Sequence, residues 1–199
     1  YSAKQTLNIM QSLYETHKLL TYPRTDSRYI SDDIIPTLKE RLQSISIDVY
    51  EPFAQKLLKS GIKTNKRIVD NSKVSDHHAI IPTEEYVELH RLSRDERNIY
   101  DLVVRRFLAV FMPASEYDVT RISAKCKNHT FKTSGKIVVE AGWRALYNLK
   151  DVFDEDEEEI DDQSLPAVQK EQQYSIHQVV LSTHFTNPPA RYTEATLLS

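Results

Sequence analysis

Tyr22 lies in a short segment whose residue types could attack and hold a phosphate. The segment reads LLTYPRTDSRY over residues 19–29, and Arg24, Asp26 and Arg28 all lie within six positions of the tyrosine. A phenol has a pKa of about 10 in water, so at neutral pH it needs assistance to act as a nucleophile. A guanidinium two residues away can favour the phenolate and can hold a phosphate through paired hydrogen bonds. The segment is therefore a candidate site for phosphodiester chemistry.

The same residues also fit an ordinary turn. Pro23 fixes the backbone beside Tyr22, an ion pair can join Arg24 to Asp26, and Asp26 and Ser27 can hydrogen-bond to the nearby backbone. Spacing alone favours this simpler interpretation, so the residues by themselves leave both alternatives open.

A second motif is SDHHAIIPT, residues 75–83. Neighbouring side chains of an extended segment point to opposite sides, so His77 and His78 are not expected to form a metal site together. Either one histidine is hydrogen-bonded in a loop and the other is solvated, or one of them binds a phosphate or positions Tyr22. Ile80 and Ile81 are expected to anchor the segment in the core.

The elements that must position these motifs are helical in the first half of the chain. The apolar spacing predicts helices over 2–19 and 92–113, with capping boxes formed by Ser2 with Gln5 and by Ser93 with Glu96. Two further helices are predicted over 31–45, capped by Ser31, and over 51–60, ending at Gly61. The predicted core face of the last helix comprises Ile99, Leu102, Val103 and Phe107, with Arg105 and Arg106 on its solvated face.

After Pro113 the hydrophobic period changes to alternation, which predicts strands over 117–126, 130–142 and 172–185. Trp143 and the aromatic residues of 117–147 are expected to belong to the core of this β region. The acidic run 154–163 is expected to be a solvated loop between strands and not a metal site. The fold class is therefore α+β, with a helical unit over 1–112, antiparallel β structure to about residue 187, and a third region beginning at 188.

Composition limits the function only loosely. The net charge is −3, but residues 1–112 carry 17 Lys and Arg against 15 Asp and Glu, and nine acids lie between Asp151 and Asp162. The single cysteine, Cys126, excludes a disulfide framework and suits a reducing intracellular compartment. Neither a signal peptide nor an apolar run of transmembrane length is present in the sequence, so no membrane association is expected. Both ends look like parts of a longer chain.

Three stretches taken together resemble the type IA DNA topoisomerases, and most closely the bacterial topoisomerase III branch. They are LYETHKLLTYPRTDSRYIS, DHHAIIPT and HFTNPPARYTEATLL, and they occur in the family's order. The resemblance implies that Tyr22 is the catalytic tyrosine that becomes linked to a DNA 5′-phosphate, and that Arg24 contacts the scissile phosphate. It further implies DNA contacts for His77, Arg28 and Arg191, whereas no role is carried onto His78.

The resemblance also implies an arrangement of domains. Residues 1–112 match the helical catalytic-tyrosine domain, 113–187 the second half of a β-rich hinge domain, and 188–199 the start of the domain that cradles the single strand. The family's Mg²⁺ ligands belong to an N-terminal domain upstream of Tyr1, so this chain is expected to bind no metal and to cleave no DNA alone. Single-stranded DNA and that metal-binding domain are the expected partners, and the expected location is the bacterial cytoplasm, at the nucleoid.

Other protein classes fit less well. Rolling-circle relaxases use a histidine–hydrophobe–histidine motif, which the adjacent His77 and His78 do not provide. Tyrosine recombinases carry basic residues upstream of a C-terminal tyrosine, whereas Tyr22 comes early. The alternative from a different class is a noncatalytic module that binds single-stranded nucleic acid, whose affinity would fall steeply with salt.

Overall fold

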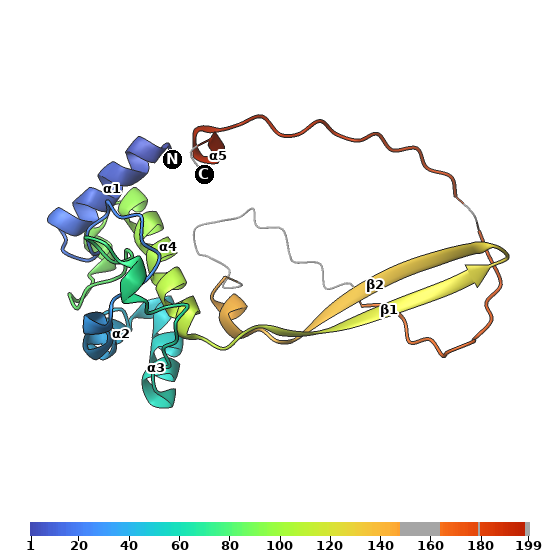
Figure 1. The fold of residues 1–199 in the computed structure, drawn as a ribbon, viewed down its shortest axis with the longest axis horizontal. Helices are drawn as coiled ribbons and strands as arrows, with labels where there is room; N and C mark the ends of the chain where they lie inside the picture. The colour runs from blue at the N-terminus through green and yellow to red at the C-terminus, as the bar shows by residue number, and fades with distance from the viewer. Residues whose placement is uncertain (148–163, 179, 198–199) are drawn as a thin grey trace. The chain divides into compact units, whose positions relative to one another are not determined.

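The computed structural model describes residues 1–147, 164–178 and 180–197, and the acidic run predicted as a loop lies outside them. The fold is α+β, as predicted (Figure 1). The chain divides into two units, Tyr1–Glu116 with Val139–Glu158, and Tyr117–Val138 with Glu159–Ser199. The first unit contains the helices α1 (Ala3–Glu15), α2 (Leu38–Ser44), α3 (Glu51–Ser60) and α4 (Arg94–Phe111), together with short 3-10 turns.

The two longest helices begin where the sequence predicted. Ser2 caps α1 and Ser93 caps α4, and in each case the side chain at the third helical position, Gln5 or Glu96, returns a hydrogen bond to the cap residue. Helix α1 ends at Glu15, earlier than the predicted residue 19, because Lys18 adopts a positive φ of 59° and the chain then turns towards Tyr22. Helix α3 ends at Gly61, as predicted, and that glycine has a φ of 79°.

The helix predicted over 31–45 is two elements. Asp32–Thr37 forms a 3-10 helix, η1, and only Leu38–Ser44 is α-helical, as α2. Pro36 lies inside η1, where it can donate no backbone hydrogen bond. Ser31 is the N-cap residue, as predicted, but its side chain makes no capping hydrogen bond.

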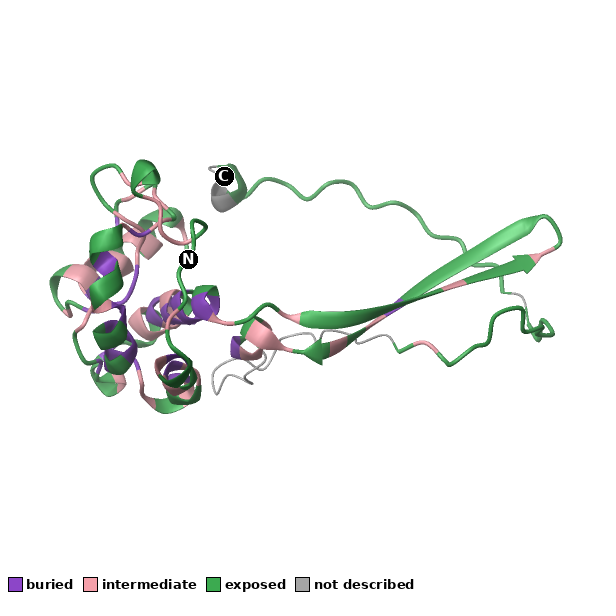
Figure 2. Ribbon diagram, turned by 60° about the horizontal axis from the view of Figure 1, so that its bottom comes forward, coloured by how far each residue is buried: buried purple, intermediate pink, exposed green. Residues whose placement is uncertain are grey.

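The buried core of the first unit lies between its helices, as the purple positions in Figure 2 show. Helices α1 and α3 both contact α4, whose residues Ile99, Val104, Phe107 and Leu108 are buried. Two predictions for α4 are wrong: Leu102 is 60% exposed, whereas Arg105, assigned to the solvated face, is only 3% exposed. Arg105 lies one turn after Asp101 and one turn before the buried Leu108, and its guanidinium donates to Asp101 and to the backbone oxygen of Leu146.

The β structure is a two-stranded hairpin of β1 (Glu116–Cys126) and β2 (His129–Glu140), as predicted for these two segments. The third predicted strand is wrong, since residues 172–178 and 180–185 are exposed and form no strand. An alternating sequence makes a strand only where a neighbour pairs its backbone, and these residues have no such neighbour among those described. The expected β core is also absent there: Tyr117 and Phe131 are 48% and 61% exposed, and Trp143 lies in the 3-10 helix η5 (Gly142–Leu146).

The segment after the proline pair of the C-terminal motif turns helical, as the sequence indicated. It forms a single short helix, α5 (Glu194–Leu197). Among the described residues, no helix has the length and apolar character needed to cross a membrane.

Candidate active site

The tyrosine segment and the histidine segment, about sixty residues apart in sequence, are hydrogen-bonded side by side. Leu20 and Pro82 form an antiparallel bridge. The Thr21 amide donates to the Ile81 oxygen at 3.0 Å, and the Thr83 amide donates to the Leu19 oxygen at the same distance. The two motifs that the sequence singled out therefore belong to one site.

Threonine side chains extend this connection on both sides of Tyr22. Thr21 Oγ1 donates to the Ala79 oxygen at 3.2 Å and accepts from the Ile81 amide at 2.9 Å. Thr25 Oγ1 donates to the His77 oxygen at 2.9 Å. These hydroxyls fix the backbone on either side of the phenol, a role that sequence reasoning missed because a threonine near a proline fits any turn.

Tyr22 is half-buried between two rings. Its ring centroid lies 4.2 Å from that of His77, with the planes tilted by 36°, and 5.5 Å from that of Tyr14, in an edge-on arrangement. Tyr14 comes from the last turn of α1, so the end of that helix supports the phenol from one side. Among the described residues none accepts a hydrogen bond from the Tyr22 hydroxyl, which leaves its oxygen available to a substrate.

Arg24 and His77 line one open pocket beside Tyr22, with a volume of about 410 Å³. Its other lining residues are Thr25, Asp26, Ser75 and Asp76. Arg24 is exposed and makes one long hydrogen bond, 3.4 Å from Nη2 to Gln11 Oε1, and it forms no ion pair with Asp26 or any other described acid. The structure thus brings a guanidinium and an imidazole together at an open pocket, and the imidazole lies against the ring of Tyr22. We call this pocket the Tyr22 pocket, although Tyr22 itself is not one of its lining residues. A phenol, a guanidinium and an imidazole are the groups that binding and attack of a phosphate require.

The turn after Arg24 is held by Ser27 and not by Asp26. Ser27 Oγ donates to the Lys73 oxygen at 2.8 Å and accepts from the Tyr29 amide at 3.1 Å. The expected local hydrogen bonds of Asp26 are not present, and its carboxylate lines the pocket instead. A carboxylate there limits the positive charge that Arg24 brings to the pocket.

The remaining predicted DNA contacts, Arg28 and Arg191, are not among the lining residues of this pocket. Arg28 is exposed, and Arg191 belongs to the second unit; neither forms an ion pair with a described residue. The two histidines lie in different surroundings. His78 is half-buried, and its Nδ1 lies 2.7 Å from the Ala79 oxygen, whereas His77 is exposed and its ring lies beside that of Tyr22. The prediction that the two histidines face different surroundings is confirmed, and Ile81 is buried as expected, with Ile80 packed against the core.

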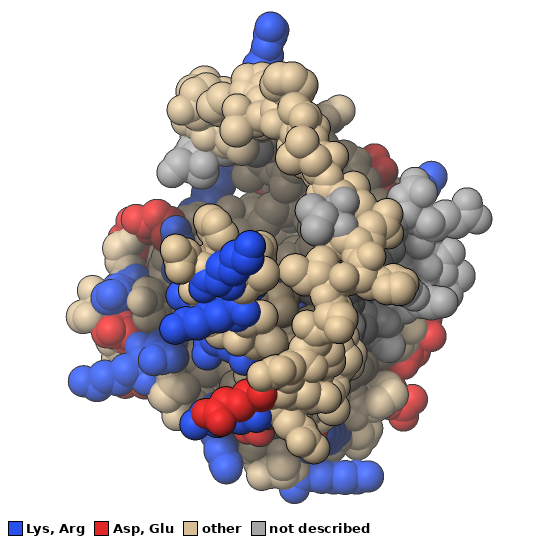
Figure 3. Space-filling model, turned by 90° about the vertical axis from the view of Figure 1, so that its right-hand side faces the viewer, with Lys and Arg blue, Asp and Glu red and all other residues tan. Residues whose placement is uncertain are grey.

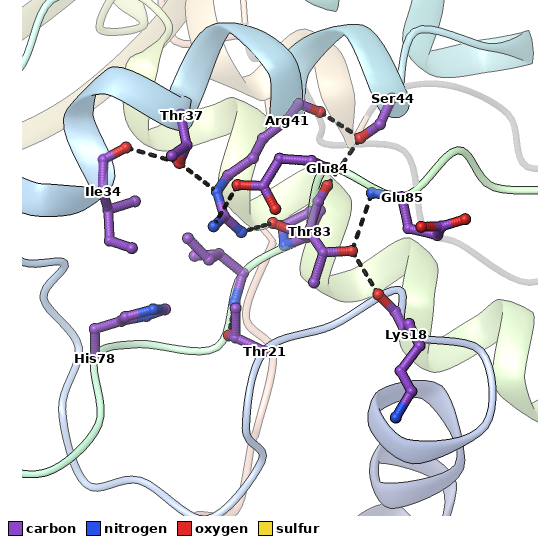
Figure 4. A network of polar contacts seen from close by, with 12 residues as sticks. Lys18, Thr21, Ile34, Thr37, Arg41, Ser44, His78, Thr83, Glu84 and Glu85 are labelled. Atoms are coloured by element: carbon purple, nitrogen blue, oxygen red, sulfur yellow. Dashed lines mark hydrogen bonds and ion pairs between the residues drawn. The ribbon is translucent and has the colours of Figure 1, made fainter.

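Arg41 supports the histidine segment from inside the protein (Figure 4). Only 6% exposed, it donates from Nη1 to the Pro82 oxygen at 2.6 Å and from Nε to Thr37 Oγ1 at 2.8 Å, and its Nη2 lies 2.7 Å from Glu84 Oε1. Burial lowers the pKa of Arg41, while the Glu84 and Asp33 carboxylates act in the opposite direction. The sequence held a signal for this residue, since Arg41 falls on the helix face of Leu38, Leu42 and Ile45.

A second polar cluster fixes α1 against α4. Glu96 Oε1 accepts from Ser12 Oγ at 2.7 Å and lies 3.1 Å from His17 Nε2. Partial burial by itself raises the pKa of Glu96, but the hydrogen bonds from Ser12 and Ser93 and the charge of His17 together lower it to about 2. The carboxylate therefore stays ionised and holds the end of α1, from which Tyr14 reaches the site.

The described residues offer no site for a divalent cation. No group of three or more His, Cys, Asp or Glu side chains is placed among them to hold a metal ion. The Tyr22 pocket is lined by two carboxylates, Asp26 and Asp76, and by the imidazole of His77. Mg²⁺ prefers oxygen ligands in an octahedral arrangement, which two carboxylates and an imidazole do not supply, so these residues do not fit Mg²⁺ by themselves.

The sequence and the structure are similar to those of known proteins of one kind. The family model described as DNA topoisomerase matches residues 1–199. DNA topoisomerase 3 of Bacillus cereus is 52% identical over the 199 residues, and DNA topoisomerase 3 of Bacillus subtilis is 49% identical; all of this chain and 27% of each relative are covered. The solved structure of full-length topoisomerase I from Thermotoga maritima matches 76% of this chain and 24% of that chain, with a TM-score of 0.51 and 26% identity. The chain thus spans about a quarter of the length of the curated relatives it matches.

Proposed function

Because this chain belongs to the DNA topoisomerase family and is similar over its full length to bacterial DNA topoisomerase 3, we propose that Tyr22 is a nucleophile that breaks one strand of DNA. In the proposed step, Tyr22 Oη forms a bond to a backbone phosphorus, and the bond from that phosphorus to the 3′ oxygen of the preceding nucleotide breaks. The phenol proton leaves to solvent, and the departing 3′ oxygen takes up a proton. The product is a 5′-phosphotyrosine with a free 3′ hydroxyl.

Resealing is the reverse reaction. The 3′ hydroxyl attacks the phosphotyrosine, one phosphorus–oxygen bond forms as another breaks, and Tyr22 is regenerated. Since the ester conserves the energy of the broken phosphodiester, the cycle consumes no ATP. Passage of another strand through the break before resealing would change DNA topology.

The observation that carries this proposal is the joining of the two motifs. Backbone hydrogen bonds between 19–21 and 81–83 place the His77 ring 4.2 Å from that of Tyr22, and Arg24 and His77 line the same pocket. Arg24 would neutralise charge that develops on the phosphate, and His77 would contact a phosphate oxygen from the opposite side. The edge-on contact with Tyr14 and the fixed backbone at Pro23 limit the directions available to the phenol, which favours attack.

The proposal extends to the intact protein. Its substrate would be single-stranded DNA, which Arg28 and Arg191 would help to bind, and its location would be the bacterial cytoplasm, at the nucleoid. Mg²⁺ would be held by a metal-binding domain outside this chain, and no step above passes through the metal. The 199-residue chain alone is therefore expected to form no covalent adduct.

The test is adduct formation by the full-length protein. Single-stranded oligonucleotides labelled at the 5′ or the 3′ end are incubated with protein and Mg²⁺, and denaturing gels show which label remains on the protein. The 3′-labelled piece should be retained, and Tyr22→Phe should lose the adduct completely. Tyr14→Phe is the matched control, because it removes a hydroxyl from the ring that contacts Tyr22 and should keep the adduct.

Two results would overturn the assignment. An adduct that survives in Tyr22→Phe would move the nucleophile to another residue. Absence of any adduct, with salt-sensitive DNA binding retained, would favour a noncatalytic module that binds single-stranded nucleic acid.

A further inference from the structure

The hairpin carries basic residues along most of its length, and its three acids, Glu116, Asp118 and Glu140, all lie near its base. Between Val119 and Val139 there are five Lys and Arg residues and no Asp or Glu, although the whole chain has 29 acidic residues against 26 basic ones. The five are Arg121, Lys125, Lys127, Lys132 and Lys136. The positive charge of the second half of the chain is therefore concentrated in β1, β2 and the turn that joins them.

The register of the hairpin places four of these side chains on one face. The two-residue turn at 127–128 sets Cys126 opposite His129, and the bond from Ser115 Oγ to the Glu140 oxygen, 3.2 Å, keeps the same register at the base. Counting back from the turn sets Lys125 opposite Thr130, and Lys132 opposite Ser123. Residues opposite each other, and those two positions along a strand, share a face. We call the set Arg121, Lys125, Lys132 and Lys136 the basic hairpin face.

A ring contact supports this register. Lys136 Nζ lies 3.6 Å from the centroid of the Tyr117 ring, which requires both side chains to lie on the same face of the hairpin. Arg121, Lys125 and Lys132 are exposed, and Lys136 is half-buried against that ring. Figure 3 shows Lys and Arg side chains exposed on the side of the molecule that it views.

By the same register the acidic Glu140 also lies on this face, at the base of the hairpin. None of its four side chains forms an ion pair with a residue in the described ranges, whereas Arg41 and Arg105 in the first unit do. Lysines on exposed strands also prevent unwanted pairing of strand edges, but charges of both signs serve that purpose. A surface of one sign, by contrast, attracts a partner of the opposite sign.

We propose that the basic hairpin face binds the phosphate backbone of DNA, as a contact separate from the Tyr22 pocket. The choice of DNA among polyanions rests on the proposed function. In this register Lys136 lies opposite Val119, six residues along the hairpin from Lys125, so the face extends over about 20 Å at about 3.4 Å per residue. One DNA strand presents one charge per about 3.4 Å, so roughly six phosphate charges would lie along that length. None of the four residues lines the Tyr22 pocket, and the two contacts belong to different units.

The proposal is tested by the salt dependence of DNA binding. The full-length protein with Tyr22→Phe, which prevents cleavage, is titrated with a labelled oligonucleotide at several salt concentrations. Replacing all four residues of the basic hairpin face by Gln should flatten the slope of log affinity against log salt by up to about 2.8, at about 0.7 for each single-strand phosphate contact. The matched control replaces Lys56, Lys59, Lys63 and Lys66, in α3 and the segment after it, by Gln and should retain the original slope.

A second measurement uses unmutated protein, so it does not depend on whether the variants fold. An amine-reactive reagent is applied with and without DNA, and DNA should protect Lys125, Lys132 and Lys136 but not Lys56 or Lys59. A variant that exchanges Lys and Arg within the basic hairpin face should keep the slope, since it keeps the charge.

The proposal is overturned if the Gln variant keeps the original slope, if the α3 control flattens it equally, or if DNA protects none of the three hairpin lysines. These failures are distinct from failure of the proposed function. An adduct with an unchanged slope rejects only the hairpin contact, and a flattened slope without an adduct rejects only the Tyr22 chemistry.

Discussion

Arg41 should hold the histidine segment beside Tyr22, and its replacement tests how the site is built. Arg41→Met keeps the side-chain stem but removes the donor to the Pro82 oxygen, which lies 2.6 Å away in the interior. An unsatisfied buried carbonyl costs about 1–3 kcal/mol. The ion pair with Glu84 adds roughly 0–1 kcal/mol, because that carboxylate is 38% exposed and water can replace the guanidinium. The two contributions together span about 1–4 kcal/mol, and we take the middle of that range, about 2–3 kcal/mol, as the expected loss.

Hydrogen exchange of single amides measures this loss where it should occur. The Thr21 and Thr83 amides donate across the bridge between the two motifs, so their protection reports its opening. A loss of 2–3 kcal/mol corresponds to a decrease in protection of roughly 30- to 150-fold, at about 1.4 kcal/mol for each factor of ten. Arg41→Lys, which keeps the charge and one donor, should give an intermediate decrease.

Lys39→Met is the matched control, since Lys39 is a basic residue of the same helix that is exposed. It should change protection by no more than about twofold, because surface substitutions usually stay within about 0.5 kcal/mol. If Arg41→Met left the Thr21 and Thr83 amides as protected as Lys39→Met does, the reasoning that Arg41 secures the bridge would be refuted.

Two further predictions concern the framework of the first unit. The lowered pKa of Glu96, about 2 against an ordinary 4.5, means that its ionised form stabilises the fold above pH 4.5 and that this contribution is lost as the pH falls towards 2. Glu96→Gln should therefore be less stable to unfolding than the unmutated protein at pH 7 and should lose less stability between pH 4.5 and 2. Glu40→Gln, at an exposed position, should follow the unmutated protein. If the stability of Glu96→Gln fell with pH in parallel with that of the unmutated protein, the prediction would be contradicted. Gly142→Ala should cost more than about 3 kcal/mol in urea unfolding, because the residue has a φ of 54° and a Cβ would lie 2.4 Å from the Ala114 oxygen. Gly61→Ala has a positive φ but open space around it and should cost only about 1–2 kcal/mol, so equal losses would disprove the steric argument.

Local signals in the sequence were sufficient for much of the framework. The capping boxes of α1 and α4, the end of α3 at Gly61 and the change to a β pattern after Pro113 all depend on residues a few positions apart, and the structure has each of them. The family resemblance rested on short motifs of the same kind, and the comparisons confirm it. The roles given to Tyr22, Arg24, Arg28, His77 and Arg191 remain predictions.

Where the sequence misled, the deciding contacts were distant in the chain. Residues 172–185 alternate like a strand, but a strand needs a partner to pair with, and alternation cannot supply one. Arg105 was assigned to the solvent by its charge, although its helix position turns it inwards towards the Leu146 oxygen. A charged residue can lie in the interior only when other groups satisfy it, and of the two partners of Arg105 only Asp101 is close in sequence, whereas Leu146 is not.

The sequence by itself determined the residues able to do the chemistry and the helix that precedes them, because residue type and local spacing are properties of a short segment. Only the tertiary structure decided that Tyr22 lies against His77 and that Arg24 shares a pocket with that histidine. That arrangement depends on backbone hydrogen bonds between residues about sixty positions apart and on the buried guanidinium of Arg41 behind them. Such bonds form only when the intervening helices have packed, since each buried polar group requires a partner that the local chain does not contain.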